Sequence, residues 1–241
     1  MDRTQQIFDI IRFTADKTLY YGASIEMPQI LLDTGNYTKH TDVNFPLGHS
    51  RYGGPIVDFP PGIEYPKDLL FAAQLDLSKF SPFDKSGLLP KSGQLLFFAN
   101  IRNDTGKVIY VDVPNENLVR HIKEHDDDFF SGRLVDKIFA DTEKLSERIR
   151  EPEEYEMDYV NKDGKIWDDT AGSEKSKIFG MFTHCQYGQE EIENVIFSDK
   201  ILLLQVGEND FNDEGVFSVL IDKSDLQNKI FDNCEFAWGQ S

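Results

Sequence analysis

Two histidines and a glutamate stand at a spacing that can bind zinc. His121, Glu124 and His125 form an HxxEH pattern. On a helix, residues four apart share a face, so both imidazoles could hold a zinc ion while the glutamate activates a water molecule. The aspartates at 126–128 and the lack of a motif for a third ligand favour another interpretation, a solvated helix flank. We expect no metal cofactor and keep these three residues as the metal candidates.

Residues 210–215 begin like a calcium-binding loop. Asp210, Asn212 and Glu214 would supply oxygen ligands, and a glycine follows at position 215. The last position of such a loop would be Ile221 instead of a bidentate glutamate, and the flanking residues are strand-like. We interpret the stretch as a tight acidic turn between two strands, with divalent-cation binding as the alternative.

Nucleophilic and nucleotide chemistry have little support in the sequence. Cys185 follows His184, but adjacent residues on a strand point to opposite faces, so they would not form a productive pair. There is no GxxxxGK[ST] sequence, and Gly53-Gly54 lacks the spacing of a dinucleotide loop. Without CxxC spacing or a disulfide framework, Cys185 and Cys234 are predicted to be reduced thiols of a cytoplasmic protein. We expect no cofactor.

An arginine and several glutamines are the candidates for ligand binding. Arg51 precedes a glycine pair whose small size lets a ligand or another backbone approach. Gln74 and Gln205 end apolar strands, where a buried amide must have its hydrogen bonds satisfied. A cleft between two halves of the chain would use these groups, whereas internal hydrogen bonds and an internal ion pair of Arg51 are the alternative that we favour. The ligand-binding candidates are Arg51, Gly53, Gly54, Gln74, Gln186, Gln205 and Asp213, and the cleft would be lined by Arg51, Gln74, Gln186 and Gln205.

Helices and strands must position these groups. The spacing of apolar residues predicts helices over residues 4–16, at 118–122 and from 131 to the proline at 152. Asp163-Gly164 predicts a hairpin between residues 159–160 and 166–167. Apolar, β-branched and aromatic runs predict strands at 69–75, 94–101, 108–113, 200–206 and 216–221.

Two parts of the chain resemble each other. Residues 69–75 and 200–206 are apolar runs with a glutamine near the end, and each is followed by a loop, a glycine and a second apolar run. This pattern predicts an internal duplication with units at 45–112 and 178–238, although two apolar hairpins could also be alike by chance. We expect a single α+β domain over residues 1–241. It would contain two related, mostly antiparallel sheet units packed together, a charged helical insert at 113–177 and an N-terminal helix.

The same residues are similar to YwqG-like proteins. The first half has Arg51 to Pro55 and a strand over residues 70–77, and the second half has Gly180 and Gln186 ahead of the strand at 202–205. The resemblance covers residues 45–110 and 178–238. It implies a soluble α+β protein with a duplicated β-rich architecture and without an established reaction or cofactor.

This chain departs from the YwqG-like pattern at two places. Phe211-Asn212-Asp213 stands where the family has Trp-Gly-Asp, and a proline expected shortly after Gly180 is absent. If those residues shape a ligand site in relatives, that site differs here.

The chain is strongly acidic, and its charge is unevenly placed. It has 25 Lys and Arg against 43 Asp and Glu, a net charge of −18, which argues against binding to nucleic acid. Residues 112–169 and 190–241 each carry a net charge of −9, so the rest of the chain is neutral. No run of 18 apolar residues predicts a membrane span, and the N-terminus has no signal-peptide pattern.

These observations favour a non-enzymatic binding or interaction protein. Its acidic surface would engage a basic protein or peptide on one side of the molecule. The alternative function is a hydrolase or a small-molecule-binding protein that uses the cleft between the halves. Solvated acidic faces that only maintain solubility are a third explanation of the charge.

Overall fold

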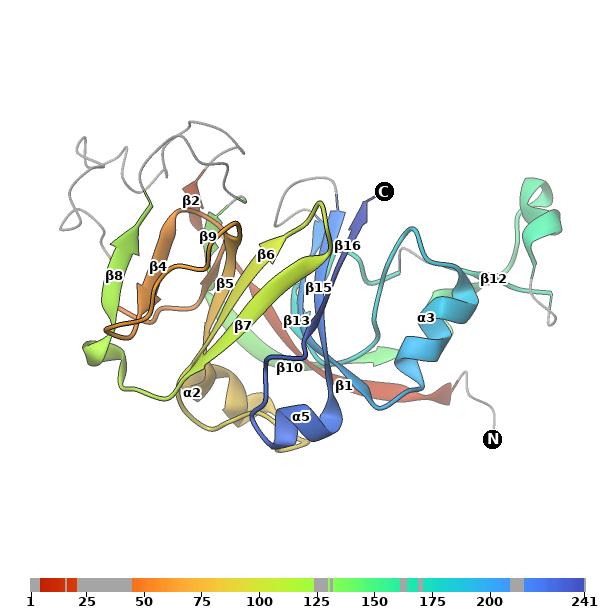
Figure 1. The fold of residues 1–241 in the computed structure, drawn as a ribbon. Coiled ribbons are helices and arrows are strands. Elements are labelled where there is room, and N and C mark those ends of the chain that lie inside the picture. Colours follow the sequence, from red (N-terminus) through yellow and green to blue (C-terminus); the bar gives the residue numbers. More distant parts are fainter. Residues whose placement is uncertain are drawn as a thin grey trace.

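Two six-stranded sheets, in which every pairing is antiparallel, pack against each other (Figure 1). The computed structural model describes residues 5–15, 17–20, 45–123, 130, 132–160, 164–168, 171–208 and 215–240. We call the sheet built mainly from the N-terminal half sheet I and the other one sheet II.

Sheet I has the strand order β2–β9–β3–β5–β6–β7. Its strands β5 and β6 are apolar on both faces, which is typical of strands covered on both sides. The strands are β2 (Lys17–Tyr20), β9 (Gly132–Leu134), β3 (Arg51–Tyr52), β5 (Leu70–Asp76), β6 (Gln94–Asn100) and β7 (Thr105–Val111).

Sheet II has the strand order β10–β1–β13–β14–β15–β16. Its central strands β14 and β15 are again buried along most of their length. The strands are β10 (Lys137–Lys144), β1 (Ile7–Thr14), β13 (Lys177–Ile178), β14 (Lys200–Val206), β15 (Gly215–Asp222) and β16 (Glu235–Gln240).

Short elements complete the described fold. β4 (Ile56–Phe59) pairs with β8 (Val119–Ile122), and β11 (Ile149–Arg150) pairs with β12 (Ile166–Trp167). The α-helices are α2 (Leu77–Phe80), α3 (Gln189–Ile196) and α5 (Lys223–Gln227). The 3-10 helices are η3 (Ser81–Phe83), η4 (Asn115–Asn117), η5 (Leu145–Arg148) and η6 (Glu154–Tyr159).

Two strand pairs link the sheets. The chain passes from β1 in sheet II to β2 in sheet I, and it returns from β9 in sheet I to β10 in sheet II. Since β1 pairs with β10 and β2 with β9, both crossings belong to one two-stranded ribbon. Phe13 at the end of β1 is buried where this ribbon passes between the sheets.

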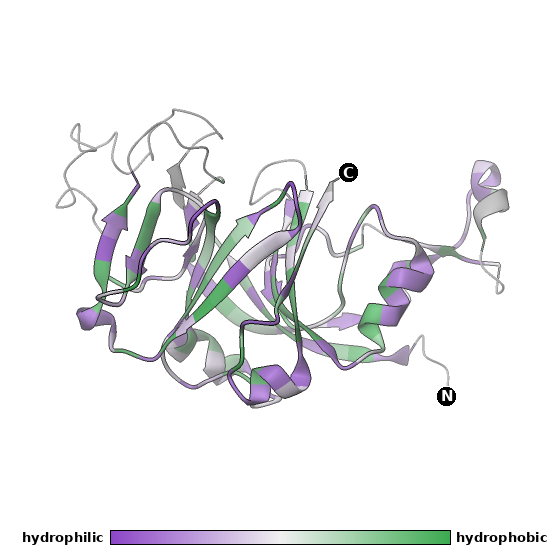
Figure 2. Cartoon of the chain, in the orientation of Figure 1, coloured by the Kyte–Doolittle hydropathy of each residue, from purple (hydrophilic) through white to green (hydrophobic). Residues whose placement is uncertain are grey.

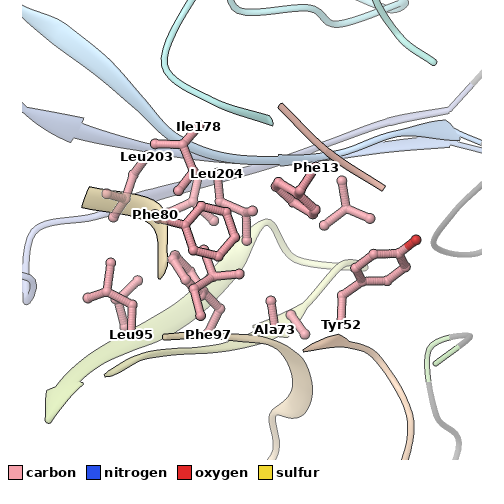
Figure 3. Close-up of a cluster of buried hydrophobic side chains, with 14 of the residues drawn as sticks. Phe13, Tyr52, Ala73, Phe80, Leu95, Phe97, Ile178, Leu203 and Leu204 are labelled. Atoms are coloured by element: carbon pink, nitrogen blue, oxygen red, sulfur yellow. The ribbon is translucent and has the colours of Figure 1, made fainter. Parts of the chain in front are cut away.

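Side chains from both sheets fill the space between them. Phe13 and Phe80 lie in this core with ring centroids 5.5 Å apart (Figure 3). Each large apolar side chain buried here contributes about 1.5–3 kcal/mol. The core members labelled in Figure 3 are Phe13, Tyr52, Ala73, Phe80, Leu95, Phe97, Ile178, Leu203 and Leu204.

The two sheets repeat one local arrangement of charge and amide. Arg51 on β3 lies opposite Gln74 on β5, and Lys177 on β13 lies opposite Gln205 on β14. All four residues are 0% exposed. Each sheet therefore buries a cation and a glutamine at the same register position.

The backbone around these pairs is also alike. After each cation the chain adopts positive φ at two successive residues, which are Gly53 and Gly54 (60° and 78°) in sheet I and Phe179 and Gly180 (67° and 86°) in sheet II. The long strand that follows has a register shift two residues before its glutamine, between Phe71 and Ala73 and between Leu202 and Leu204. The two sheets thus share a turn, a bulge and a pairing.

The predicted N-terminal helix is wrong, because residues 7–14 form strand β1. Ile10 and Ile11 are adjacent and both buried (2% and 1% exposed). In a strand covered on both faces the apolar residues can have the same spacing as in a helix, so spacing alone does not separate the two structures. Isoleucine is β-branched and favours the strand.

The predicted helical insert is also wrong. Residues 119–122, 132–134 and 137–144 are strands β8, β9 and β10, and helical structure in the described part of 113–177 is limited to 3-10 turns. The hairpin predicted between residues 159–160 and 166–167 is wrong as well, because residues 166–167 (β12) pair with residues 149–150 (β11). Long-range pairing with β1, β3 and β4 decides these segments, and a local pattern contains no information on it.

The five strands predicted from apolar runs are confirmed. They correspond to β5, β6, β7, β14 and β15, with ends that differ by no more than three residues. The result is a sheet-rich α+β fold with few short helices.

Candidate functional site

A buried arginine lies at the centre of a polar cluster in sheet I. Arg51 Nη2 is 3.2 Å from Asp58 Oδ2 and donates to Gln74 Oε1 at 2.8 Å. Its Nε donates to the Ile56 carbonyl oxygen at 3.0 Å, and its Nη1 donates to the His49 carbonyl oxygen at 2.7 Å. Burial lowers the pKa of Arg51 to about 10, and Asp58 opposes that shift, so the guanidinium stays charged at neutral pH.

Asp58 joins this arginine to a second one. Arg120 Nε lies 2.8 Å from Asp58 Oδ1, and the Gly48 N–H donates to Asp58 Oδ2 at 2.9 Å. Burial by itself would raise the pKa of Asp58, but the charges of Arg51 and Arg120 lower it below its usual value. The cluster is therefore an ion triad with one carboxylate between two guanidinium groups.

Gln74 extends the cluster along the sheet. Its Oε1 accepts from Arg51 and from the Asp58 N–H (3.0 Å), and its Nε2 donates to the Gln94 Oε1 at 3.2 Å. Gln94 Nε2 in turn donates to Asn115 Oδ1 at 2.7 Å. These amides satisfy one another, as the internal interpretation of Gln74 expects.

The glycine pair after Tyr52 turns the chain from β3 of sheet I to β4. The Gly53 N–H donates to the Ala72 carbonyl oxygen at 2.7 Å, and the Gly54 N–H donates to the Phe130 carbonyl oxygen at 2.8 Å. A Cβ at Gly132 would come within 2.9 Å of Gly54, so the backbones approach closely here. The pair serves backbone packing in this structure.

Sheet II has a buried lysine at the corresponding place. Lys177 Nζ donates to Glu143 Oε1 at 2.6 Å and to the Met181 carbonyl oxygen at 2.9 Å, and the Met181 N–H donates to Glu143 Oε2 at 2.9 Å. Burial lowers the pKa of Lys177 to about 8 against the opposing charge of Glu143. Although burial would raise the pKa of Glu143, Lys177 lowers it below the usual range.

Gln205 is bonded differently from its counterpart. Its Nε2 donates to the carbonyl oxygens of Gly172 (2.9 Å) and Lys175 (2.8 Å). Within the described part of the chain, its Oε1 and the neighbouring Ser218 Oγ are buried without a hydrogen-bond partner. Arg51 donates to Gln74, whereas Lys177 donates to Glu143 and leaves the side-chain oxygen of Gln205 unbonded. The hydrogen bonds of the sheet II cluster are therefore less complete than those of the Arg51 cluster.

The structure brings together only some of the predicted ligand residues. Arg51, Gly53, Gly54 and Gln74 belong to sheet I, whereas Gln205 belongs to sheet II and Gln186 is exposed in the turn before α3. Asp213 lies outside the described residues. The partner of Arg51 is Asp58 on β4, in the same half of the chain, so the ion pair is internal and joins β3 of sheet I to the β4–β8 pair.

The HxxEH pattern is not on a helix as far as the structure describes it. His121 lies on β8 opposite Val57, and its ring packs edge-on against Phe59 with centroids 5.3 Å apart. Glu124 and His125 lie outside the described residues. Among the residues that are described, no group of three or more His, Cys, Asp and Glu could hold a metal ion.

Both cysteines are free thiols. Burial and nearby carboxylates raise the pKa of Cys234 to about 12, so it is an unreactive thiol at neutral pH. His184, which precedes Cys185, is buried and stacks on Tyr187 with ring centroids 3.8 Å apart. Burial lowers the pKa of His184.

Part of the acidic stretch at residues 112–169 projects from the fold, which the sequence analysis did not predict. We define the acidic segment as residues 151–157, which lie between β11 and β12 and extend away from both sheets (Figure 1). Tyr155 is 75% exposed and Met157 is 57% exposed, the first and third most exposed large apolar side chains of the described chain. Four glutamates lie in the same seven residues, so the charge is visible in the sequence, whereas the exposure of the two apolar side chains is not.

A groove lies between the two halves, but other residues than the predicted ones line it. It has a volume of about 430 Å³ and is lined by β1, by residues 83–88 of the first half and by β14 of the second. None of the predicted cleft residues lines it. Five separate segments contribute to the groove, and no local pattern could have joined them.

Comparison with protein families gives one result. Residues 50–239 match the family described as a domain of unknown function, DUF1963. Comparison with curated proteins gives no match. No helix in the described ranges has the length and apolar character needed to cross a membrane. Because the match covers more than half of the chain, this protein belongs to the DUF1963 family.

Proposed function

We propose that the protein is a non-enzymatic interaction module that binds a cationic polypeptide through the acidic segment. The observation that carries this proposal is the exposure of Tyr155 and Met157 among glutamates on a segment that projects from the sheets. Exposed apolar side chains that lie together and are rimmed by polar residues mark sites of interaction with a partner.

The electrostatics of the segment suit a basic partner. Glu151, Glu153 and Glu154 are exposed, and hydrophilic residues predominate in its helical part and on α3 (Figure 2). The carboxylates of Glu153 and Glu156 raise the pKa of the Tyr155 phenol, which indicates a negative local potential. Such a potential attracts a basic partner and accelerates its association.

The segment is held in place before any partner arrives. Arg150 Nη1 and Nη2 donate to the two carboxylate oxygens of Glu156 at 2.7 and 2.6 Å, and the Glu153 N–H donates to Glu156 Oε2 at 2.9 Å. Lys165, directly before β12, pairs with Glu151. An ordered segment loses less conformational entropy on binding than a disordered one.

Two further inferences, on the origin of the two halves and on the location of the protein, accompany this proposal. We infer that the two halves arose by duplication, because the Arg51–Gln74 and Lys177–Gln205 pairs, the positive-φ turns and the bulges correspond. The similarity to YwqG-like proteins over the same regions agrees with this inference. Two free cysteines agree with a cytoplasmic location.

Binding of a synthetic peptide of lysine and leucine tests the proposal. We expect calorimetric titration to show affinity that falls as NaCl is raised from about 0.05 to 0.5 M. The double variant Glu153→Gln with Glu154→Gln should weaken binding about three- to tenfold, because two surface charges are lost. Tyr155→Ala should weaken it by about fivefold or more at all salt concentrations, because its contact is apolar.

A matched double variant distinguishes binding to the acidic segment from a general effect of the net charge of the protein. Glu64 and Glu116 are exposed acids on the sheet I half, so Glu64→Gln with Glu116→Gln removes the same charge elsewhere. We expect this variant to bind nearly as well as the wild type. Equal losses in both double variants would show that only the total charge matters, and the segment would have no special role.

A further inference from the structure

The groove between the halves has apolar walls. Its floor is formed by the buried residues Ile10, Phe179 and Leu202, which are 2%, 9% and 3% exposed. Leu88 from the first half and Ile196 from the end of α3 also line the groove. A volume of about 430 Å³ lies in the range of small-molecule sites, about 300–1,000 Å³.

The rim of the groove is basic, although the chain as a whole is acidic. Lys85, Lys200 and Lys223 line it, together with the carboxylates of Asp9 and Asp84. Asp84 is turned into its own loop, where Oδ1 accepts from Ser86 and Oδ2 accepts from the Leu89 N–H at 2.8 Å.

The three lysines differ in their partners. Lys85 Nζ is 2.6 Å from Asp9 Oδ1, an ion pair that joins the two walls of the groove. Lys200 pairs with Asp222 and Glu235. Among the ion pairs of the described chain, none involves Lys223, an exposed residue at the start of α5. Its ammonium group is the counter-charge that the groove offers to a ligand.

We propose that this groove binds a small molecule with an apolar body and one carboxylate group, with Lys223 pairing to the carboxylate. The floor and walls exclude water from the apolar body, and the rim lysine fixes its orientation. This inference is independent of the interaction proposed for the acidic segment, which lies outside the groove.

Octanoate is the probe for the test, with acetate and 1-octanol as partial ligands. Calorimetric titration of the full chain should show octanoate binding at least about 100-fold more tightly than acetate, since a buried CH₂ contributes about 0.8 kcal/mol. Lys223→Gln should weaken octanoate binding about two- to fivefold, the effect of one partly exposed ion pair, and should leave octanol binding unchanged. Lys223→Arg should restore the affinity.

Two further variants complete the design. Leu88→Glu places a carboxylate in the wall and should abolish octanoate binding, with the fold checked by thermal unfolding. Lys91→Gln removes an exposed lysine outside the groove and should change nothing. Absence of octanoate binding overturns the proposal, and so does equal weakening of octanol and octanoate by Lys223→Gln.

Discussion

Buried ion pairs join strands that are not hydrogen-bonded neighbours. Asp58 and Arg51 are both 0% exposed, and so is Lys177 beside Glu143. A buried ion whose partner is removed keeps the full cost of its lost hydration, so each member depends strongly on the other. These clusters therefore contribute more to the choice of which strands lie together than to the net stability of the fold.

Asp58→Asn should destabilise the protein by about 3–5 kcal/mol, because it leaves two guanidinium groups without their shared carboxylate. Urea unfolding at pH 7 measures the change. The control is Asp141→Asn, which removes an exposed partner 3.6 Å from Arg12 and should cost about 1 kcal/mol or less. Similar losses in the two variants would contradict a structural role of the buried cluster.

The Asp58 contribution should also depend on pH. Its folded pKa lies below the ordinary value of about 3.9, so the stability it supplies is fully present above that value. That stability is lost as the pH falls through the folded pKa. The difference in unfolding free energy between wild type and Asp58→Asn should therefore narrow on acidification below about pH 4.

At the scale of elements, β1 connects the two sheets. It pairs with β10 and β13 in sheet II, and the chain then enters sheet I through β2. Phe13 at its end contacts Phe80 and Tyr52, with ring centroids 5.5 and 6.4 Å away. The strand therefore contributes to the core on which both sheets depend.

Phe13→Ala should cost about 3–5 kcal/mol, the usual loss when a buried phenylalanine is truncated. Ile7→Ala at the other end of the same strand is the comparison, because Ile7 is 59% exposed. It should cost less than about 1 kcal/mol. Denaturant midpoints measure both variants, and a small loss for Phe13 would contradict its placement in the core.

At the scale of the whole molecule, one apolar core serves both sheets, whereas the acidic charge is concentrated in two stretches of the chain. Leu95 and Phe97 of sheet I lie in the same cluster as Leu204 and Val219 of sheet II. The acidic excess belongs to residues 112–169 and 190–241. The shared core couples the folding of the two halves, while the charge determines what approaches the molecule.

The shared core predicts that the halves unfold together. Both tryptophans come from the second half, Trp167 on β12 and Trp238 on β16 of sheet II, where the Trp238 N–H also donates to Asp104 of the first half. Their fluorescence therefore reports on sheet II and on its contact with sheet I. Far-UV circular dichroism reports on both sheets. The two probes should give coincident urea transitions, as for a single cooperative unit. Separate midpoints would instead divide the chain into two independently folding domains.

The sequence by itself determined the central strands and the internal bonding of the buried polar groups. The runs that became β5, β6, β14 and β15 are continuous and apolar, and only a strand buried on both faces needs that composition. For the same reason Gln74 could be predicted to bond internally, because a buried amide requires partners.

Only the tertiary structure decided the conformation of β1, β8 and β10 and the sites at the surface. Strand pairing joins residues more than one hundred positions apart, as between Ile7 and Lys144, and local spacing carries no record of it. The groove likewise needs walls from both halves, and the exposure of Tyr155 exists only because its segment leaves the sheets. The composition of a strand indicates that both of its faces are buried, whereas the strands with which it pairs are determined only when the whole chain folds.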